Sequence, residues 1–200
     1  MSKKKILIAG IVLMLAAVAV IYFGFINTDN SDIKGRIHLL KEESVVMRFK
    51  IIIPESSENE ECRYVLAAKL FDLDGDVVGR FETEFDGSDI KFTFTDINIS
   101  DKHLIFPESM IFDSQNKIKT LNLKSYYAYQ GCPEIYRSQI IDRDLLRGIC
   151  NVFALLAEKG KGKVEKKYGR VTKIEKILKN PGERTLYQLT IKSDGNITID

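Results

Sequence analysis

Cysteine and histidine are scarce in this chain, and their scarcity limits the classes of protein it can belong to. The 200 residues include three cysteines, Cys62, Cys132 and Cys150, and two histidines. Three cysteines are too few for a small scaffold built on disulfides. In an oxidising compartment one pair can form, and we prefer Cys132–Cys150 because it closes the shortest loop. The odd count fits equally well with three reduced cysteines buried as small apolar side chains.

The sequence also lacks a readable set of catalytic or metal-binding residues. His38 and His103 lie far apart, and no local motif supplies the nucleophile and orienting partner that a histidine base needs. Alternating aspartates from Asp72 to Asp76 look like the opening of a calcium loop, but Gly75 falls at the fourth position, where that loop needs glycine at the sixth. A tight hairpin turn explains the same residues. We therefore expect no enzyme activity, no cofactor and no metal.

The most informative feature is a long apolar run. Ile6–Ile26 contains 21 apolar or small residues without interruption and follows Lys3–Lys5. At about 1.5 Å per residue a helix of this length reaches roughly 31 Å, enough to cross a bilayer core. The lysines should stay in the cytoplasm. We predict that residues 1–27 form a single-pass signal-anchor in the cell membrane and that the remainder is extracytoplasmic, either periplasmic or extracellular.

A cleaved signal peptide is the alternative interpretation of the same segment. Ala17–Ala19 has the small-x-small pattern of a cleavage site. The apolar run continues past Ala19 to Ile26, so a site there would lie within the membrane, and the uncleaved anchor is favoured. Both interpretations export the domain that follows.

Charge is distributed unevenly over the exported part. Residues 28–157 hold 16 basic and 22 acidic residues, whereas residues 158–200 hold 11 basic and 6 acidic residues. The basic residues are concentrated in a Gly- and Lys-rich stretch that resembles no nucleotide-binding loop. A flexible surface loop is the simpler interpretation of this stretch. The candidate ligand-binding residues are Lys159, Lys161, Lys163, Lys166, Lys167 and Arg170.

The exported region has the pattern of a mainly β protein. Residues 28–33 are expected to be a linker and residues 34–200 one domain. Short alternating runs separated by turn residues predict an antiparallel, immunoglobulin-like sandwich over about 34–130, with Arg63 to Ile99 as a three-stranded meander. The expected strands are Val45–Ile53, Arg63–Phe71, Val77–Phe85, Ile90–Ile99, Leu104–Phe106, Ser109–Phe112 and Ile118–Ala128.

The last third of the chain predicts one helix and a closing hairpin. From Ile140 to Lys159, apolar residues recur at helical spacing and Gly160 ends the pattern. This stripe is expected to pack on the sheet. Residues 170–200 are then expected to form a hairpin, in which Val171–Leu178 pairs with Thr185–Ile191.

These observations favour an interaction module over an enzyme. The predicted anchor, the β-rich domain and the missing catalytic set suggest a membrane-anchored subunit or accessory of an envelope protein complex. The alternative is a binding protein for an anionic ligand, a lipid headgroup or a wall polymer, at Lys159 to Arg170. An extracytoplasmic location argues against nucleic acid as the partner.

Overall fold

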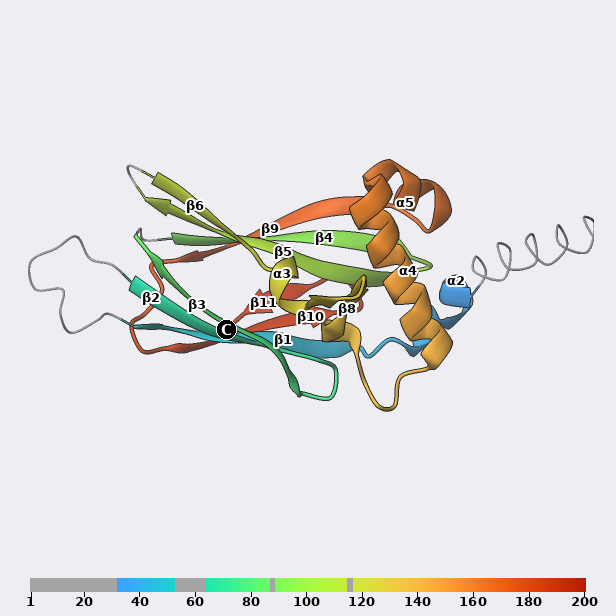
Figure 1. The fold of residues 1–200 in the computed structure, drawn as a ribbon, viewed down its shortest axis with the longest axis horizontal. Helices are drawn as coiled ribbons and strands as arrows, with labels where there is room; N and C mark the ends of the chain where they lie inside the picture. Colours follow the sequence, from blue (N-terminus) through green and yellow to red (C-terminus); the bar gives the residue numbers. More distant parts are fainter. Residues whose placement is uncertain (1–31, 53–63, 87–88, 115–116) are drawn as a thin grey trace, which may run out of the picture.

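The computed structural model describes residues 32–52, 64–86, 89–114 and 117–200 (Figure 1). The predicted anchor, residues 1–27, lies outside these ranges. Within the described ranges, no helix is both long enough and apolar enough to cross a membrane. The first described element is helix α2 (Asp32–Arg36), which leads into the 3-10 helix η1 (Ile37–Leu39). Ile33 and Ile37 are buried, so the folded domain already includes the end of the range expected to be a linker.

The chain is mainly β, and its two large antiparallel sheets pack face to face as a sandwich (Figure 1). We call the five-stranded sheet the first sheet; its strand order is β11-β10-β1-β2-β3. Its strands are β1 (Glu43–Ile52), β2 (Tyr64–Phe71), β3 (Val77–Phe85), β10 (Leu186–Lys192) and β11 (Ile197–Ile199).

The second sheet has four strands, in the order β6-β5-β4-β9. Its strands are β4 (Asp89–Ile99), β5 (Lys102–Ser114), β6 (Lys117–Asn122) and β9 (Val171–Lys179). A third, two-stranded sheet pairs β7 (Ala128–Tyr129) with β8 (Cys132–Pro133). The remaining elements are helix α3 (Lys124–Tyr127), the 3-10 helix η2 (Glu134–Tyr136), and helices α4 (Arg143–Lys159) and α5 (Lys161–Lys167).

Alternation of apolar and polar residues places the core between the sheets. In β1, Phe49 and Ile51 are buried while their neighbours Arg48 and Lys50 are exposed. The ring of Phe49 contacts that of Phe92 in β4, with centroids 5.5 Å apart. This contact between the two sheets forms because alternate residues of a strand point to opposite faces.

The predicted pairing of strands was wrong in two places. The meander from Arg63 to Ile99 is broken, because β3 pairs with β2 while β4 crosses to the second sheet. The hairpin over 170–200 does not form, because β9 pairs with β4 and β10 with β1. The sandwich therefore needs residues on both sides of the boundary expected near 130. A hairpin does join β10 to β11.

The alternation of apolar and polar residues over Ile90–Ile99 predicts a strand with one buried and one exposed face, but β4 is not half-buried along its whole length. Ile90, Phe92 and Phe94 lie on one buried face. On the opposite face Thr95 and Ile97 are also buried. Phe106, the register partner of Thr95, contacts Phe153 of α4 at 5.1 Å between ring centroids. Packing of helices against this end of the sheet therefore buries the face that alternation alone predicts to be exposed to solvent.

Two predicted strands merge, and a third ends early. Pro107 does not separate two strands; it lies inside β5, where the register with β4 shifts by one residue and leaves Glu108 as a bulge. Proline is compatible with a bulge because that position needs no ladder hydrogen bond. The strand expected over Ile118–Ala128 stops at Asn122 and is followed by α3.

Helix α4 confirms the predicted amphipathic helix, with a later start. Asp142 caps it by accepting hydrogen bonds from the backbone N–H groups of Asp144 and Leu145, so the helix begins at Arg143. The hydrogen bond from Leu145 and the charge of Arg36 hold the pKa of Asp142 below its usual value. The buried residues of α4 are Leu145, Ile149, Val152 and Phe153.

The bulge residue Glu108 connects three elements through one carboxylate. It accepts hydrogen bonds from Thr95 Oγ1 at 2.6 Å and from Lys124 Nζ at 2.8 Å, and lies 3.3 Å from Lys173 Nζ. Partial burial acts to raise the pKa of Glu108, but the hydrogen bonds from Lys124 and Thr95 outweigh it, and the pKa is lowered. The ionised form is therefore the one that the fold stabilises.

Replacing Glu108 by glutamine should destabilise the protein by about 1 kcal/mol at neutral pH. A carboxyl group with a lowered pKa in the folded state stabilises at pH values above its unfolded pKa, and this contribution disappears as the pH falls through the folded pKa. The difference between E108Q and the parent should therefore begin to shrink as the pH falls below the ordinary glutamate pKa of about 4.3, and it should be lost only below the lowered pKa of the folded state. Denaturant unfolding at several pH values measures it, and an equal difference at pH 7 and pH 3 would contradict this account.

Candidate functional site

The predicted basic loop is in fact a short helix. Helix α4 ends at Lys159, Gly160 turns the chain with a φ of 70°, and α5 follows at once. Val164 and Tyr168 are buried and fix this segment to the rest of the domain. The expectation of a flexible loop was wrong. It rested on the glycines in the sequence and did not take into account that Val164 and Tyr168 would be buried.

The six candidate cations are thus held on and beside one short helix. Two have partners on the same segment: Lys161 lies 3.6 Å from the carboxylate of Glu165, and the ammonium group of Lys167 lies 5.0 Å from the ring centroid of Tyr168. The other four are exposed and form no ion pair within the described residues. They are Lys159, Lys163, Lys166 and Arg170.

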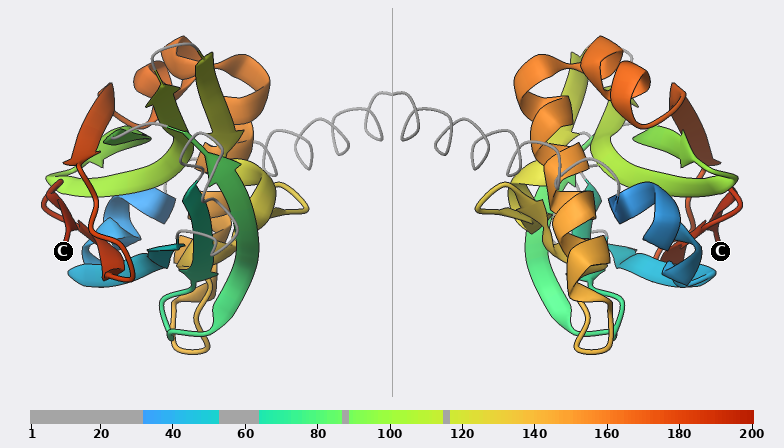
Figure 2. Two further views of the ribbon diagram at one scale, coloured as in Figure 1. Left: turned by 90° about the vertical axis from the view of Figure 1, so that its left-hand side faces the viewer. Right: turned by 90° about the vertical axis from the view of Figure 1, so that its right-hand side faces the viewer.

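This basic helix lies at the end of the molecule where the described chain begins. Helices α2, α4 and α5 gather at one end of the sandwich, whereas the chain that connects β9 to β10 lies at the other end (Figure 1). The view onto that end shows all three helices together (Figure 2). Arg36 of α2 pairs with Asp142 at 2.7 Å and with Asp144 at 3.2 Å, which ties α2 to the start of α4.

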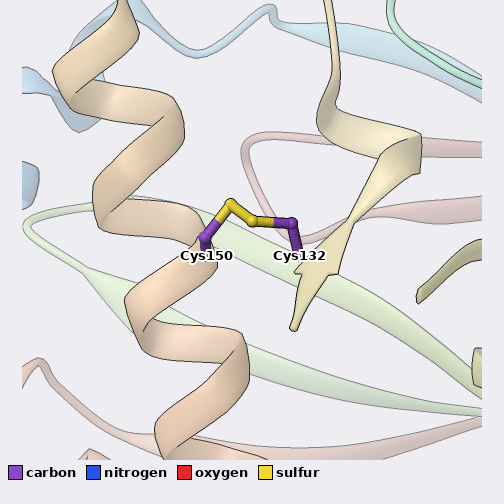
Figure 3. The surroundings of a disulfide bond; sticks show 2 residues. All are labelled: Cys132 and Cys150. Carbon is purple, nitrogen blue, oxygen red and sulfur yellow. A yellow bond between two sulfur atoms is a disulfide. The ribbon is translucent and has the colours of Figure 1, made fainter. Parts of the chain in front are cut away.

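A disulfide links α4 to the small third sheet. Cys132 of β8 and Cys150 of α4 are joined by an S–S bond of 2.18 Å, with their Cα atoms 4.5 Å apart (Figure 3). This is the pair that closes the shortest loop. The remaining cysteine, Cys62, lies outside the described residues. The bond connects two elements that share no backbone ladder and so fixes the β7–β8 hairpin on the helical end.

The aspartates of the predicted turn have structural partners. Asp72 is buried and accepts hydrogen bonds from the backbone N–H groups of Asp74 and Asp76. Its second oxygen accepts from Arg137, and Asp74 accepts from the Ser138 hydroxyl at 2.6 Å. These carboxylates close the β2–β3 turn and hold the segment before α4 against it. No group of three or more potential metal ligands occurs among the residues that the structure describes.

The two histidines lie in different environments. His38 is exposed on η1. His103 Nδ1 lies 2.8 Å from the carboxylate of Asp96, and its Nε2 lies 2.9 Å from Asn98 Nδ2. The backbone N–H of His103 donates to the carbonyl of Ser193, which docks the β10–β11 turn onto β5. Both ring nitrogens therefore contact side chains of β4 within the second sheet, and the backbone hydrogen bond to Ser193 joins that sheet to the first.

A second cationic set, which sequence reasoning missed, lies on the first sheet. Arg48, Lys69 and Arg80 come from three different strands and are brought together only by strand pairing. Finding them requires the strand register, which decides which residues of neighbouring strands lie side by side. The periodicity of a single sequence does not reveal that register.

Function is inferred from this geometry and charge, since no protein-family model, no curated protein and no solved structure matches the chain.

Proposed function

We propose that this chain is a membrane-anchored, extracytoplasmic interaction module, a non-enzymatic subunit or accessory of an envelope protein complex. The observation that carries the proposal is the position of the helical end. Five residues separate the apolar run, which ends at Ile26, from Asp32 of α2. At about 3.5 Å per residue, the six residue steps from Ile26 to Asp32 span at most about 21 Å. An anchor at Ile6–Ile26 would therefore hold the helical end next to the bilayer and leave the opposite end free for a partner.

The architecture supports a binding role more than a catalytic one. The described part of the chain is a two-sheet sandwich whose polar clusters around Asp72 and His103 join structural elements. Immunoglobulin-like character remains part of this proposal, supported by the two packed antiparallel sheets. Sandwiches of this kind present loops at their ends and sheet faces at their sides, and both are suited to protein partners.

The native mass of the full-length protein, extracted gently in detergent from its own membrane, tests the proposal. An assembly subunit should run as a defined complex much larger than the 22.8 kDa chain, with the same partners in repeated preparations. Mass spectrometry of that complex would identify the partners. Extraction as a lone monomer under every gentle condition would refute the subunit proposal.

The alternative function, binding of an anionic lipid headgroup or wall polymer at Lys159 to Arg170, is favoured by one specific observation. Four of the six cations on this segment form no ion pair within the described residues, and the segment belongs to the end that the anchor would place near the headgroups. Headgroup charge acts over a Debye length of about 8–10 Å. A basic helix held within that distance is attracted to anionic lipid.

In nanodiscs, backbone amides of α5 should exchange hydrogen more slowly with anionic than with zwitterionic lipid. The triple variant K163Q/K166Q/R170Q should lose that difference, because each basic residue near an anionic surface contributes about 1 kcal/mol. Added salt should have the same effect as the variant. The matched control K50Q/K69Q/R80Q removes equal charge from the first sheet and should keep the difference. Protection that survives in the α5 variant would show that these cations do not contact lipid.

A further inference from the structure

The outer face of the first sheet carries three cations in one row across three strands. In the β1–β2 register Arg48 lies opposite Lys69, and in the β2–β3 register Lys69 lies opposite Arg80. Adjacent strands are about 4.8 Å apart, so the row spans about 10 Å. Its next position, on β10, is Gln188. Like charges directly opposite each other destabilise a sheet, so repulsion within the row lowers the stability of the fold.

Carboxylates of the described chain do not neutralise this row. Lys69 and Arg80 are exposed and form no ion pair within the described residues. The neighbouring rung carries Lys50 on β1 and Glu82 on β3, separated by Ala67. The row and this rung together hold four positive side chains and one negative side chain. An anion placed over the row would relieve the repulsion.

Arg48 is already oriented for such an anion. Its Nε donates a hydrogen bond to Gln188 Oε1 at 3.2 Å, and its guanidinium carbon lies 5.3 Å from the ring centroid of Phe71. Stacking on an aromatic ring fixes the plane of a guanidinium. The two terminal nitrogens then remain as paired donors for a phosphate or carboxylate.

The row lies in a hollow that has apolar residues on both sides of it and charged residues on one side. The hollow has a volume of about 710 Å³ and is lined by Arg48, Lys69 and Arg80, a size typical of small-molecule clefts. On one side of the row, Phe71 lies opposite Val77, and Val77 is 37% exposed. On the other side lie Ala67 and Leu186, together with the charged residues Lys50 and Glu82; Leu186 is 64% exposed.

We propose that this hollow binds a small organic anion, in which a phosphate or carboxylate group contacts Arg48, Lys69 and Arg80 and an attached apolar group covers Phe71 and Val77 or Leu186. The charge of the row favours the anionic group, and the exposed apolar residues beside the row favour the apolar group. This site is separate from the basic helix and does not depend on the proposed anchor or on the proposed protein partner.

Four probes separate charge from apolar contact: phenyl phosphate, benzoate, inorganic phosphate and phenol. Binding is measured by nuclear magnetic resonance shifts or calorimetry on the full chain in zwitterionic nanodiscs. At least one of phenyl phosphate and benzoate should bind about tenfold more tightly than inorganic phosphate and phenol, and the tighter of the two identifies the preferred headgroup. Equal affinity for inorganic phosphate, or binding of neither aromatic anion, would overturn the proposal. Tighter binding of polyglutamate would overturn it in favour of an acidic protein segment.

The variant R48Q/K69Q/R80Q should lose the binding, while K163Q/K166Q/R170Q on the basic helix should retain it. Retained affinity in the sheet variant would place the anion elsewhere and refute the site. The single variant K69Q provides a second readout that a damaged fold would not mimic. Removing the central cation should weaken binding yet raise the unfolding temperature, because it relieves repulsion from both neighbours. A lower unfolding temperature in K69Q would contradict the proposed repulsion between Lys69 and its two cationic neighbours.

Discussion

Loss of the Cys132–Cys150 disulfide should lower the free energy of unfolding by about 3 kcal/mol. The bond joins residues 18 positions apart, and a cross-link over such a loop restricts the unfolded chain to that extent. It is also the covalent tie between the β7–β8 hairpin and α4. Denaturant unfolding of C132S/C150S, compared with its parent in a Cys62→Ser background, measures the effect without a spare thiol for exchange.

The matched control is the Cys62→Ser parent with and without reductant. Reduction of that parent should reproduce the stability of the double serine variant, since both remove the same bond. The basic helix α5 follows α4 directly, so hydrogen exchange there should also rise in both. Equal stability of oxidised and reduced parent protein would show that the hairpin is held by its noncovalent contacts alone.

Replacing Gly169 by alanine should destabilise the protein by about 3 kcal/mol, at the upper end of the usual cost of overpacking. Gly169 connects α5 to β9 and has a φ of 156°, a conformation that side chains rarely adopt. An alanine Cβ would overlap the carbonyl oxygen of Asn98 in β4. That oxygen belongs to the backbone of a buried strand and cannot move aside without disturbing the second sheet. Thermal and denaturant unfolding measure the loss.

Gly162 provides the control within the same segment. It lies inside α5, and no atom approaches its Cβ position within 4 Å. Alanine there should stabilise the protein by about 0.5–1 kcal/mol, because it favours the helix. The two substitutions make the same chemical change seven positions apart and should act in opposite directions. Similar effects at both positions would mean that the approach of Gly169 to β4 is not what decides the outcome.

The sequence predicted strand positions far better than strand partners. β3 matches its predicted bounds and β1, β2 and β4 differ by one or two residues, because apolar alternation and turn residues are local signals. Pairing depends on contacts between distant segments, so the turn residues in the sequence after β3 were wrongly interpreted as a hairpin. Glu108 shows the same limit: a bulge that joins three elements is visible only once those elements are packed.

The basic helix and the cationic row differ in how much the sequence reveals. Lys159 to Arg170 is contiguous, so its charge was apparent, although the burial of Val164 and Tyr168 that makes it a helix was not. Arg48, Lys69 and Arg80 lie on three different strands and are spread over a stretch of 33 residues in the sequence. Each looks like an ordinary solvent-facing residue of an alternating strand, and only the register places them side by side.

The strand order determines when this domain can be completed during synthesis. Strand β1 pairs with β10, as Phe49 does with Tyr187, and β4 pairs with β9. Each sheet thus receives a strand from the last 30 residues of the chain. Until those residues emerge, β1 and β4 both have an unpaired edge, and unpaired edges invite aggregation. If the chain crosses a membrane, these strand edges would have to be kept from aggregating until β9 and β10 arrive. Termination of the chain a few residues before β10 should therefore reduce folding more than most substitutions in the core.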